Sequence, residues 1–203
     1  MSATVFELSL PHVSSGLRLR GRAATLDRNQ ALDRFLAGVE RRAFRKAQIA
    51  TGDADEAMDL VQDAMLKLVQ RYGRRGEQEW APLFHAILQS RIRDWYRRTK
   101  VRNRWRQWLG SHQEKDEDDP LASIADTAQI SSDEQLKLKR AAAALEQALR
   151  TLPLRQQQAF LLRAWEELDV ADTARAMGCS QGSVKTHYFR AVHTLRKLLG
   201  DHW

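Results

Sequence analysis

Arginine and lysine are concentrated between residues 91 and 106 of this 203-residue chain. Eight bases stand there against a single acid, Asp94, so the segment carries a net charge of +7, equal to that of the whole chain. Trp95, Tyr96 and Trp105 lie among these cations. Cationic side chains neutralise phosphates, and aromatic rings stack on unpaired bases. The segment therefore predicts contact with single-stranded DNA; a solvated basic surface and aromatic core packing are the alternatives.

A second candidate for nucleic-acid contact lies near the carboxyl end of the chain. Residues 168–199 predict a short helix, a tight turn at Gly178 and Cys179, and a longer helix that Ser180 caps with its hydroxyl group. One face of the longer helix is apolar and is expected to be buried; it holds Val184, Tyr188, Ala191, Leu195 and Leu198. The opposite face carries no acid as far as Leu199, which suits a phosphate-lined groove. The pattern predicts a DNA-binding helix-turn-helix, with an ordinary amphipathic hairpin as the alternative.

The sequence offers no residues with the spacing of a catalytic or metal site. The six histidines are dispersed, and there is no HExxH motif, no glycine-rich phosphate loop and no Ser/His/Asp grouping. The single cysteine, Cys179, excludes an intramolecular disulfide and a multi-cysteine zinc site, and we expect it to pack in the core. We therefore expect no enzyme activity, no metal and no cofactor. A nuclease that uses the carboxylates near residues 53–63 is the alternative in the enzyme class.

Helices are expected to position these residues. The chain has only 10 Gly and 4 Pro, helix-forming residues dominate, and strand-like alternation of β-branched residues is absent. We expect an all-α fold of two small helical domains. Residues 29–106 form the first, in which breaks at 51–53 and 73–79 separate three helices and Pro82 opens the third; residues 132–203 form the second.

Two segments fall outside these domains. Residues 1–28 lack sustained helical periodicity and are predicted to form a mobile tail. Residues 107–131 join the domains, and from Arg106 to Ser132 six acids outnumber two bases. This composition predicts a flexible acidic linker, long enough that the two domains need not touch each other.

The helix expected between residues 53 and 72 has two contrasting faces. Its core side is predicted to hold Met58, Val61, Met65, Leu68 and Tyr72. Nearly opposite, Asp59, Asp63 and Gln70 surround a single apolar side chain, Leu66. An apolar residue within an exposed polar surface indicates a docking site for another protein. The alternative is that Leu66 packs against a neighbouring helix of the same domain.

Three stretches resemble the extracytoplasmic-function (ECF) subfamily of the sigma-70 family of bacterial RNA polymerase sigma factors. Residues 152–163, followed by the helix-turn-helix, resemble the σ4 domain. The run Asp-Leu-Val-Gln-Asp at residues 59–63 resembles the DLVQE run of the σ2 domain, and residues 87–98 resemble its IARNxAIDxLRR run. Matching positions in the helix-turn-helix are Ala174, Gly178, Ser180, Gly182, Val184, Lys185, Arg190, Ala191, Leu195 and Arg196.

The chain departs from the family pattern at several positions. Ser90 stands where the family commonly has Asn, and Arg93 stands where it has Ile. In the family that Asn helps to form the pocket for a flipped −10 base, together with the loop that corresponds to residues 73–80. The resemblance therefore implies that the preferred base or the pocket differs here. In the helix-turn-helix, Asp172-Thr173 replaces Glu-Ile and Thr186-His187 replaces Ser-Arg.

The resemblance implies three sets of binding residues. Core polymerase would be bound by Asp59, Gln62, Asp63, Leu66 and Gln70. The −10 element would be bound by Ser90, Arg91, Asp94, Trp95, Tyr96, Arg97, Arg98, Lys100 and Arg102. The −35 element would be bound by Ser180, Gln181, Gly182, Ser183, Lys185, Thr186, His187 and Arg190.

The same resemblance implies the function and the partners. A sigma factor binds the β and β′ subunits of core RNA polymerase and directs promoter-specific initiation, with double-stranded DNA at −35 and single-stranded DNA at −10. An anti-sigma factor is a further candidate partner. We find no apolar run that could span a bilayer and no secretory signal, so a cytoplasmic location is expected. The alternative is a free-standing helix-turn-helix regulator with an N-terminal dimerisation or sensing bundle. That alternative leaves residues 59–63, the basic aromatic segment and the acidic linker without a role.

Overall fold

The computed structural model describes residues 15–108 and 132–200, and the side chains of residues 26–102 and 136–200. All regular elements within these ranges are helices, which confirms the expected all-α fold. Almost all of the predicted acidic linker lies outside the described residues. No helix in the described ranges is both long enough and apolar enough to cross a membrane.

Three helices form the N-terminal part: α1 (Ser15–Thr51), α2 (Ala54–Tyr72) and α3 (Glu77–Trp108). The predicted breaks are confirmed. At the first, Gly52 has φ +75°, and the Asp53 carboxylate caps α2 by accepting a 2.9 Å hydrogen bond from the Glu56 amide. The three helices enclose an apolar core whose largest fully buried members include Trp80, Phe84, Leu68, Leu88 and Ile92.

Two predicted boundaries in this part are wrong. Helix α1 begins at Ser15, so residues 15–28 are helical and do not belong to a tail. Residues 26–30 are exposed, and the first core residue of α1 is Leu32. An exposed helical segment needs no apolar stripe, because helix-forming residues can extend a helix that is already packed further along. Helix α3 begins at Glu77 and not at Pro82, because the single backbone hydrogen bond that the proline removes is offset by packing of the buried neighbouring turns.

The C-terminal part contains α4 (Ser132–Thr151), α5 (Leu154–Phe160), a π-helical turn η1 (Leu161–Trp165), α6 (Val170–Met177) and α7 (Gln181–Leu198). One core cluster joins α4 to α7 through residues that include Leu149 and Leu195. A second cluster joins α5, α6 and α7 around Met177 and Val184. Pro153 stands at the N-cap of α5, immediately before its first turn.

Two residues of the predicted apolar stripes are exposed. Leu198 is 52% exposed, and Leu199 is buried in its place at 4%, since Leu199 lies one helical turn after the buried Leu195. Met58 is 37% exposed, whereas Val61 and Leu68 of the same predicted stripe are buried. The buried stripe of α2 runs instead through Ala57, Leu60, Val61, Ala64 and Leu68.

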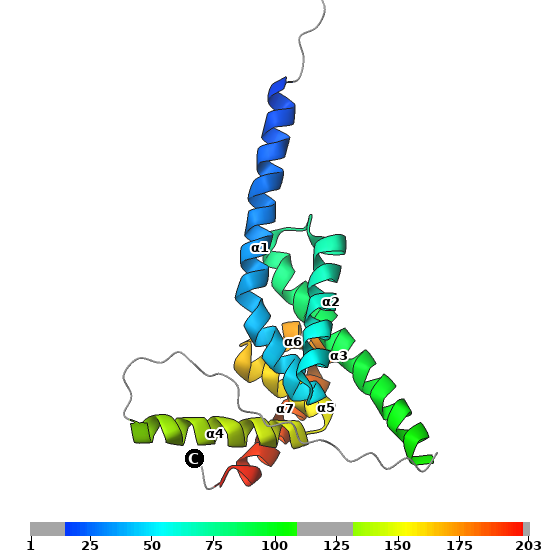
Figure 1. Ribbon diagram of the computed structural model, residues 1–203, viewed down its shortest axis with the longest axis vertical. Helices are drawn as coiled ribbons and strands as arrows, with labels where there is room; N and C mark the ends of the chain where they lie inside the picture. Colours follow the sequence, from blue (N-terminus) through cyan, green and yellow to red (C-terminus); the bar gives the residue numbers. More distant parts are fainter. Residues whose placement is uncertain (1–14, 109–131, 201–203) are drawn as a thin grey trace, which may run out of the picture.

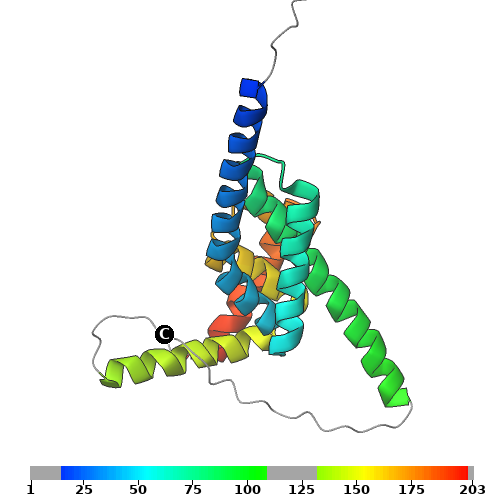
Figure 2. The same cartoon turned by 45° about the horizontal axis from the view of Figure 1, so that its top comes forward.

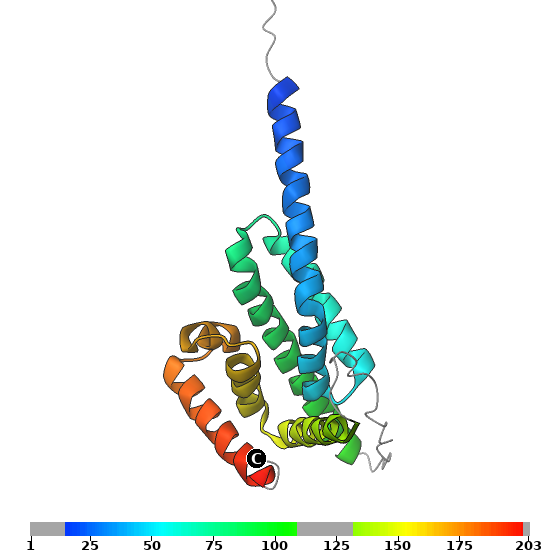
Figure 3. The same ribbon diagram turned by 90° about the vertical axis from the view of Figure 1, so that its left-hand side faces the viewer.

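The two parts pack directly against each other (Figure 1). Helix α3 packs against α6, and the end of α1 meets α4 (Figure 3). Ile49 near the end of α1 also packs in the cluster that holds Leu195 of α7. The length predicted for the linker did not require the two domains to touch, and in this structure they do touch. The N-terminal half of α1 projects beyond both parts (Figure 2).

Candidate nucleic-acid interface

Local hydrogen bonds fix the geometry of the helix-turn-helix. The Asp169 carboxylate caps α6 by accepting from the Asp172 amide at 2.6 Å. Gly178 ends α6 in the left-handed conformation, φ +61°, where a side chain would be strained. Ser180 then caps α7, its Oγ accepting a 3.1 Å hydrogen bond from the Ser183 amide. The left-handed glycine and the serine cap are both confirmed as predicted.

The inner face of α7 holds it against α5 and α6. Val184 and Ala191 are almost fully buried, and Tyr188 is half-buried. The Tyr188 ring stacks on Phe160 with centroids 6.2 Å apart, and the Arg163 guanidinium lies 5.9 Å from its centroid. Cys179 packs against the same cluster, as expected for a core residue.

The predicted −35 contacts lie on the outer face of α7, in its first turns. Ser183 and His187 are half-exposed, and the other members are exposed: Ser180, Gln181, Gly182, Lys185, Thr186 and Arg190. Burial, and then the nearby charges of Arg155 and Arg190, lower the pKa of His187, which keeps its imidazole neutral at pH 7. A methyl group added at Gly182 would meet only the Ser180 hydroxyl oxygen at 3.9 Å. Packing within the protein therefore does not require this glycine.

The predicted −10 contacts on α3 are in three different situations. Arg98, Lys100 and Arg102 are exposed near the end of the described side chains. Trp95 is partly buried against the core and donates a 2.8 Å hydrogen bond from Nε1 to the Glu56 carboxylate, so its ring is not free to stack on a base. Tyr96 is 43% exposed.

The remaining members of the −10 set make ion pairs or lie partly inside. Arg97 pairs with Asp94 at 3.1 Å, one turn away on the same helix. Arg91 lies 3.7 Å from Asp63 of α2, which joins the predicted −10 surface to the predicted polymerase surface. Ser90 is half-buried. The side chains of residues 103–106, including Trp105, lie outside the described ones.

The predicted docking surface of α2 is exposed throughout: Asp59, Gln62, Asp63, Leu66 and Gln70. Leu66 is 57% exposed, so the alternative in which it packs within its own domain is wrong. Val69, one turn further, is 44% exposed and extends the apolar part of this surface. Sequence reasoning missed Val69 although it lies three residues after Leu66.

A buried polar cluster between the two parts was not anticipated at all. Lys46 of α1 lies 2.8 Å from Glu166 and 3.3 Å from Nδ1 of His85 on α3. Burial, then the charge of Lys46, lower the pKa of His85 to about 4. Among the described residues, no three His, Cys, Asp or Glu side chains gather closely enough to hold a metal ion.

Comparison with known proteins places both parts in one family. The model of Sigma-70, region 4, matches residues 142–195. An RNA polymerase sigma-E factor of Streptomyces avermitilis is 32% identical over 159 residues, which cover 77% of this chain and 78% of the relative. The ECF RNA polymerase sigma factor SigM of Mycobacterium tuberculosis is 28% identical over 171 residues, 84% of this chain and 78% of that protein.

A solved structure agrees with these relatives. The sigma factor RpoE of Bartonella quintana, crystallised in complex with the anti-sigma factor NepR, superposes with a TM-score of 0.59 at 26% identity. The match covers 86% of this chain and 97% of that one, so it includes residues of both parts. A free-standing regulator would share only the helix-turn-helix with these proteins. The chain belongs to the ECF subfamily of the sigma-70 family and is an RNA polymerase sigma factor.

Proposed function

We propose that three exposed surfaces of this chain divide the work of promoter recognition. The outer face of α7 binds the −35 element as duplex, the cationic end of α3 binds the unpaired −10 strand, and the α2 surface around Leu66 docks on core polymerase. One observation carries the proposal: the proposed contact residues of α2 and α7 are exposed while the opposite face of each helix is buried, and Arg98, Lys100 and Arg102 are exposed near the end of α3.

On α7, the charge and the helix direction favour DNA. Lys185 and Arg190 are exposed on a face whose first turn also presents backbone amides at the positive end of the helix dipole. Gly182 leaves room for close approach of the duplex at the first turn. His187 adds a hydrogen-bonding group to the same face, and we assign it to a base edge or a phosphate oxygen.

On α3, Arg98, Lys100 and Arg102 would track the phosphates of the unpaired strand while Tyr96 stacks on a base. Trp95 would act indirectly, since its hydrogen bond to Glu56 holds α3 against α2. Ser90 has a shorter side chain than Asn and no amide, so the −10 base preference would differ from that of family members with Asn.

The α2 surface combines carboxylates with apolar side chains. Asp59 and Asp63 would attract a cationic surface of the polymerase, and Leu66 with Val69 would supply the apolar contact. By family resemblance the partner is the coiled-coil clamp helices of the β′ subunit. In this assignment the chain contributes binding and melting but no catalysis, and it works in the cytoplasm. The complex of the Bartonella quintana relative makes an anti-sigma factor a further candidate partner.

Run-off transcription with core polymerase on genomic fragments tests the proposal and identifies a promoter. On that promoter, Arg190→Ala should weaken binding of the holoenzyme by a factor of about 5 to 150, the effect of about 1–3 kcal/mol for a lost base or phosphate contact. Arg196→Ala is the matched control, because Arg196 is also an exposed arginine but lies in the last turn of α7. Equal loss in the two variants, or no transcription from any fragment with folded protein, would contradict the proposal.

A further inference from the structure

The amino-terminal half of α1 extends beyond the packed core. The first core residue of α1 is Leu32, and residues 26–30 before it are exposed. Leu32 lies seventeen positions after Ser15, so at about 1.5 Å per residue the helix continues for about 25 Å beyond the core. Figure 2 shows this half projecting away from the other helices. We call residues 15–31 the arm of α1.

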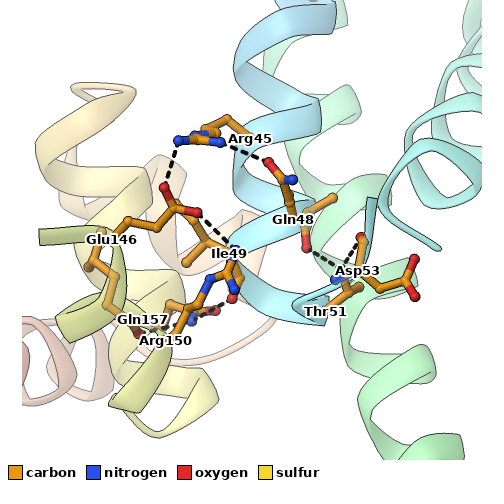
Figure 4. A network of polar contacts seen from close by, with 10 residues as sticks. Arg45, Gln48, Ile49, Thr51, Asp53, Glu146, Arg150 and Gln157 are labelled. Carbon is orange, nitrogen blue, oxygen red and sulfur yellow. Dashed lines mark hydrogen bonds and ion pairs between the residues drawn. The ribbon is translucent and has the colours of Figure 1, made fainter. Parts of the chain in front are cut away.

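The carboxyl half of α1 gives the arm a fixed base. Arg45 forms a 2.6 Å ion pair with Glu146 of α4 and donates a 2.9 Å hydrogen bond to the Gln48 side chain (Figure 4). Ala47, on the same half, is fully buried in the N-terminal core. Because α1 is one continuous helix, the arm continues the axis of a segment that is anchored by these contacts.

The arm is rich in arginine. It holds four bases and one acid, a net charge of +3: Arg18, Arg20, Arg22, Arg28 and Asp27. Arg28 is exposed, and no carboxylate among the described side chains lies within ion-pair distance of it. Positive charge concentrated on a projecting helix attracts a partner of negative charge.

A second basic group lies at the base of the arm, in the turn between α2 and α3. A methyl group added at Gly73 of this turn would lie 3.3 Å from Cδ2 of Leu32, so the turn contacts α1 where the arm ends. Arg71 and Arg74, on either side of that glycine, are exposed and form no ion pair within the part of the chain whose side chains are described. The cationic surface therefore continues from the arm onto this turn.

The apolar residues of the arm favour duplex DNA over a membrane as the polyanionic partner. A helix that binds a lipid surface needs a continuous apolar face, and residues 15–28 have no sustained apolar periodicity. Duplex DNA offers closely spaced phosphates and requires no apolar contact. The arm length of about 25 Å corresponds to about seven base pairs at about 3.4 Å each, so several phosphates lie within its reach.

The position of the arm relates it to the −10 element. By family resemblance, residues 73–80 help to form the pocket for a flipped −10 base, and Arg74 lies in this loop. The far end of α3, which we assign to the unpaired strand, points away from the arm (Figure 1). Duplex DNA on the arm would therefore lie beside the −10 pocket, on the side away from the cationic end of α3.

We propose that the arm of α1, together with Arg71 and Arg74, binds the phosphates of duplex DNA that flanks the −10 element. Contacts to phosphates position a protein on DNA and read no sequence, so the arm adds affinity without changing promoter choice. Binding to duplex DNA follows from the charge of the arm alone. Its placement beside the −10 element rests on the function proposed above for α3.

The salt dependence of duplex binding tests the proposal in the full-length protein. The combined variant Arg18→Ala, Arg20→Ala and Arg22→Ala keeps the helix, because alanine has the highest helix propensity, and circular dichroism checks this. The affinity for a fluorescent duplex of mixed sequence is measured by anisotropy over a range of salt concentrations. Each lost phosphate contact lowers the salt slope by about 0.9, so the variant should have a slope smaller by about 2.7.

Three further variants separate contact from net charge. Lysine at the same three positions keeps the charges and should keep the wild-type slope. Arg74→Ala removes one contact from the turn and should lower the slope by about 0.9. The control, Arg41→Ala with Arg42→Ala and Arg140→Ala, removes three exposed arginines outside the arm and should leave the slope unchanged.

The results on mixed-sequence duplex decide whether the arm binds DNA. A smaller slope for the alanine variant alone, restored by lysine, supports the proposal. Equal slopes for the alanine variant and the wild type, or the same decrease in the control, overturn it. Binding to phosphatidylglycerol vesicles that the alanine variant loses, with unchanged slopes on DNA, would overturn it in favour of a membrane contact.

A hydroxyl-radical footprint tests the placement of the arm. On the promoter found by run-off transcription, the wild-type holoenzyme should protect duplex beside the −10 element that the alanine variant leaves open to cleavage. Identical footprints would overturn the placement. Absence of run-off transcription by the wild-type holoenzyme would count against the proposed function instead, because the salt slopes on mixed-sequence duplex do not depend on a promoter.

Discussion

Truncation of Leu66 to alanine should weaken binding to core polymerase without affecting the fold. Burial contributes about 0.8 kcal/mol per methylene-sized group, so removal of three carbons costs about 2.4 kcal/mol if all of them become buried at the interface. Leu66 is 57% exposed in the free chain, so a partner can bury only about that fraction more. The expected loss is about 1.4 kcal/mol, a tenfold increase in Kd.

Leu26→Ala is the matched control for this experiment. Leu26 is 61% exposed, close to the value for Leu66, but it lies on the projecting half of α1 and not on the α2 surface. Titration of fluorescent sigma factor with core polymerase gives the two Kd values, and urea unfolding of the free variants gives their stabilities. Equal Kd values for the two variants, or a Leu66→Ala protein that is itself markedly less stable, would refute the assignment of this surface.

The other predictions concern the cap of α7, the buried histidine and the cationic end of α3. Ser180→Ala should lower the free energy of unfolding by about 1 kcal/mol, because the first turn of α7 loses its side-chain cap, and Ser180→Asp should retain most of it, as thermal unfolding would show. The pKa of His85 is about 4 in the folded chain and 6.5 in the unfolded chain, so the unfolded chain takes up the proton first as the pH falls. The free energy of unfolding should therefore keep the full contribution of neutral His85 above pH 6.5. It should fall by up to about 3 kcal/mol as the pH approaches 4. His85→Asn keeps an acceptor for Lys46 but cannot titrate, so urea unfolding of this variant should show a smaller change of stability with pH. The same pH dependence as in the wild type would contradict the role assigned to His85. Arg98→Ala should reduce the salt slope of single-stranded DNA binding by about 0.7, whereas Arg41→Ala should leave the slope unchanged.

Sequence reasoning succeeded where the signal is local. The left-handed turn at Gly178, the Ser180 cap and the buried Val184 of α7 follow from residues a few positions apart, and the structure has all three. The same holds for the break at residues 51–53. Exposure of Leu66 also followed from helical periodicity, since the buried side of α2 was already occupied by Val61 and Leu68.

The predictions failed where packing competes with a local preference. Pro82 was placed at the start of a helix because proline favours the first turn, but Trp80 and Phe84 anchor the turns on either side of it. Leu198 and Leu199 illustrate the same limit: two adjacent leucines at a helix end are equally compatible with the pattern, and only contact with α4 selects Leu199. Adjacent positions differ by 100° around a helix, so an error of one residue moves a side chain out of the core.

Contacts between distant residues left no pattern in the sequence. Lys46 and Glu166 are 120 positions apart, and neither differs in type from a surface residue. Glu166 directly follows the π-helical turn η1, and both side chains are buried where the two parts meet. Lysine and glutamate are rarely buried, even as a pair. With 33 bases and 26 acids in the chain, the sequence gives no reason to predict that these two residues form a buried pair.

The basic segment shows how this limit affects a functional argument. Its net charge of +7 was taken as a measure of its affinity for polyanions, but the described cations are not equivalent. Arg91 and Arg97 have carboxylate partners, and Arg93 has the carbonyls at the end of α6, whereas Arg98 and Lys100 are exposed at the far end of the segment. A cation that already has a protein partner must lose it before it can neutralise a phosphate. The charge available to DNA is therefore smaller in this structure than the sequence indicates.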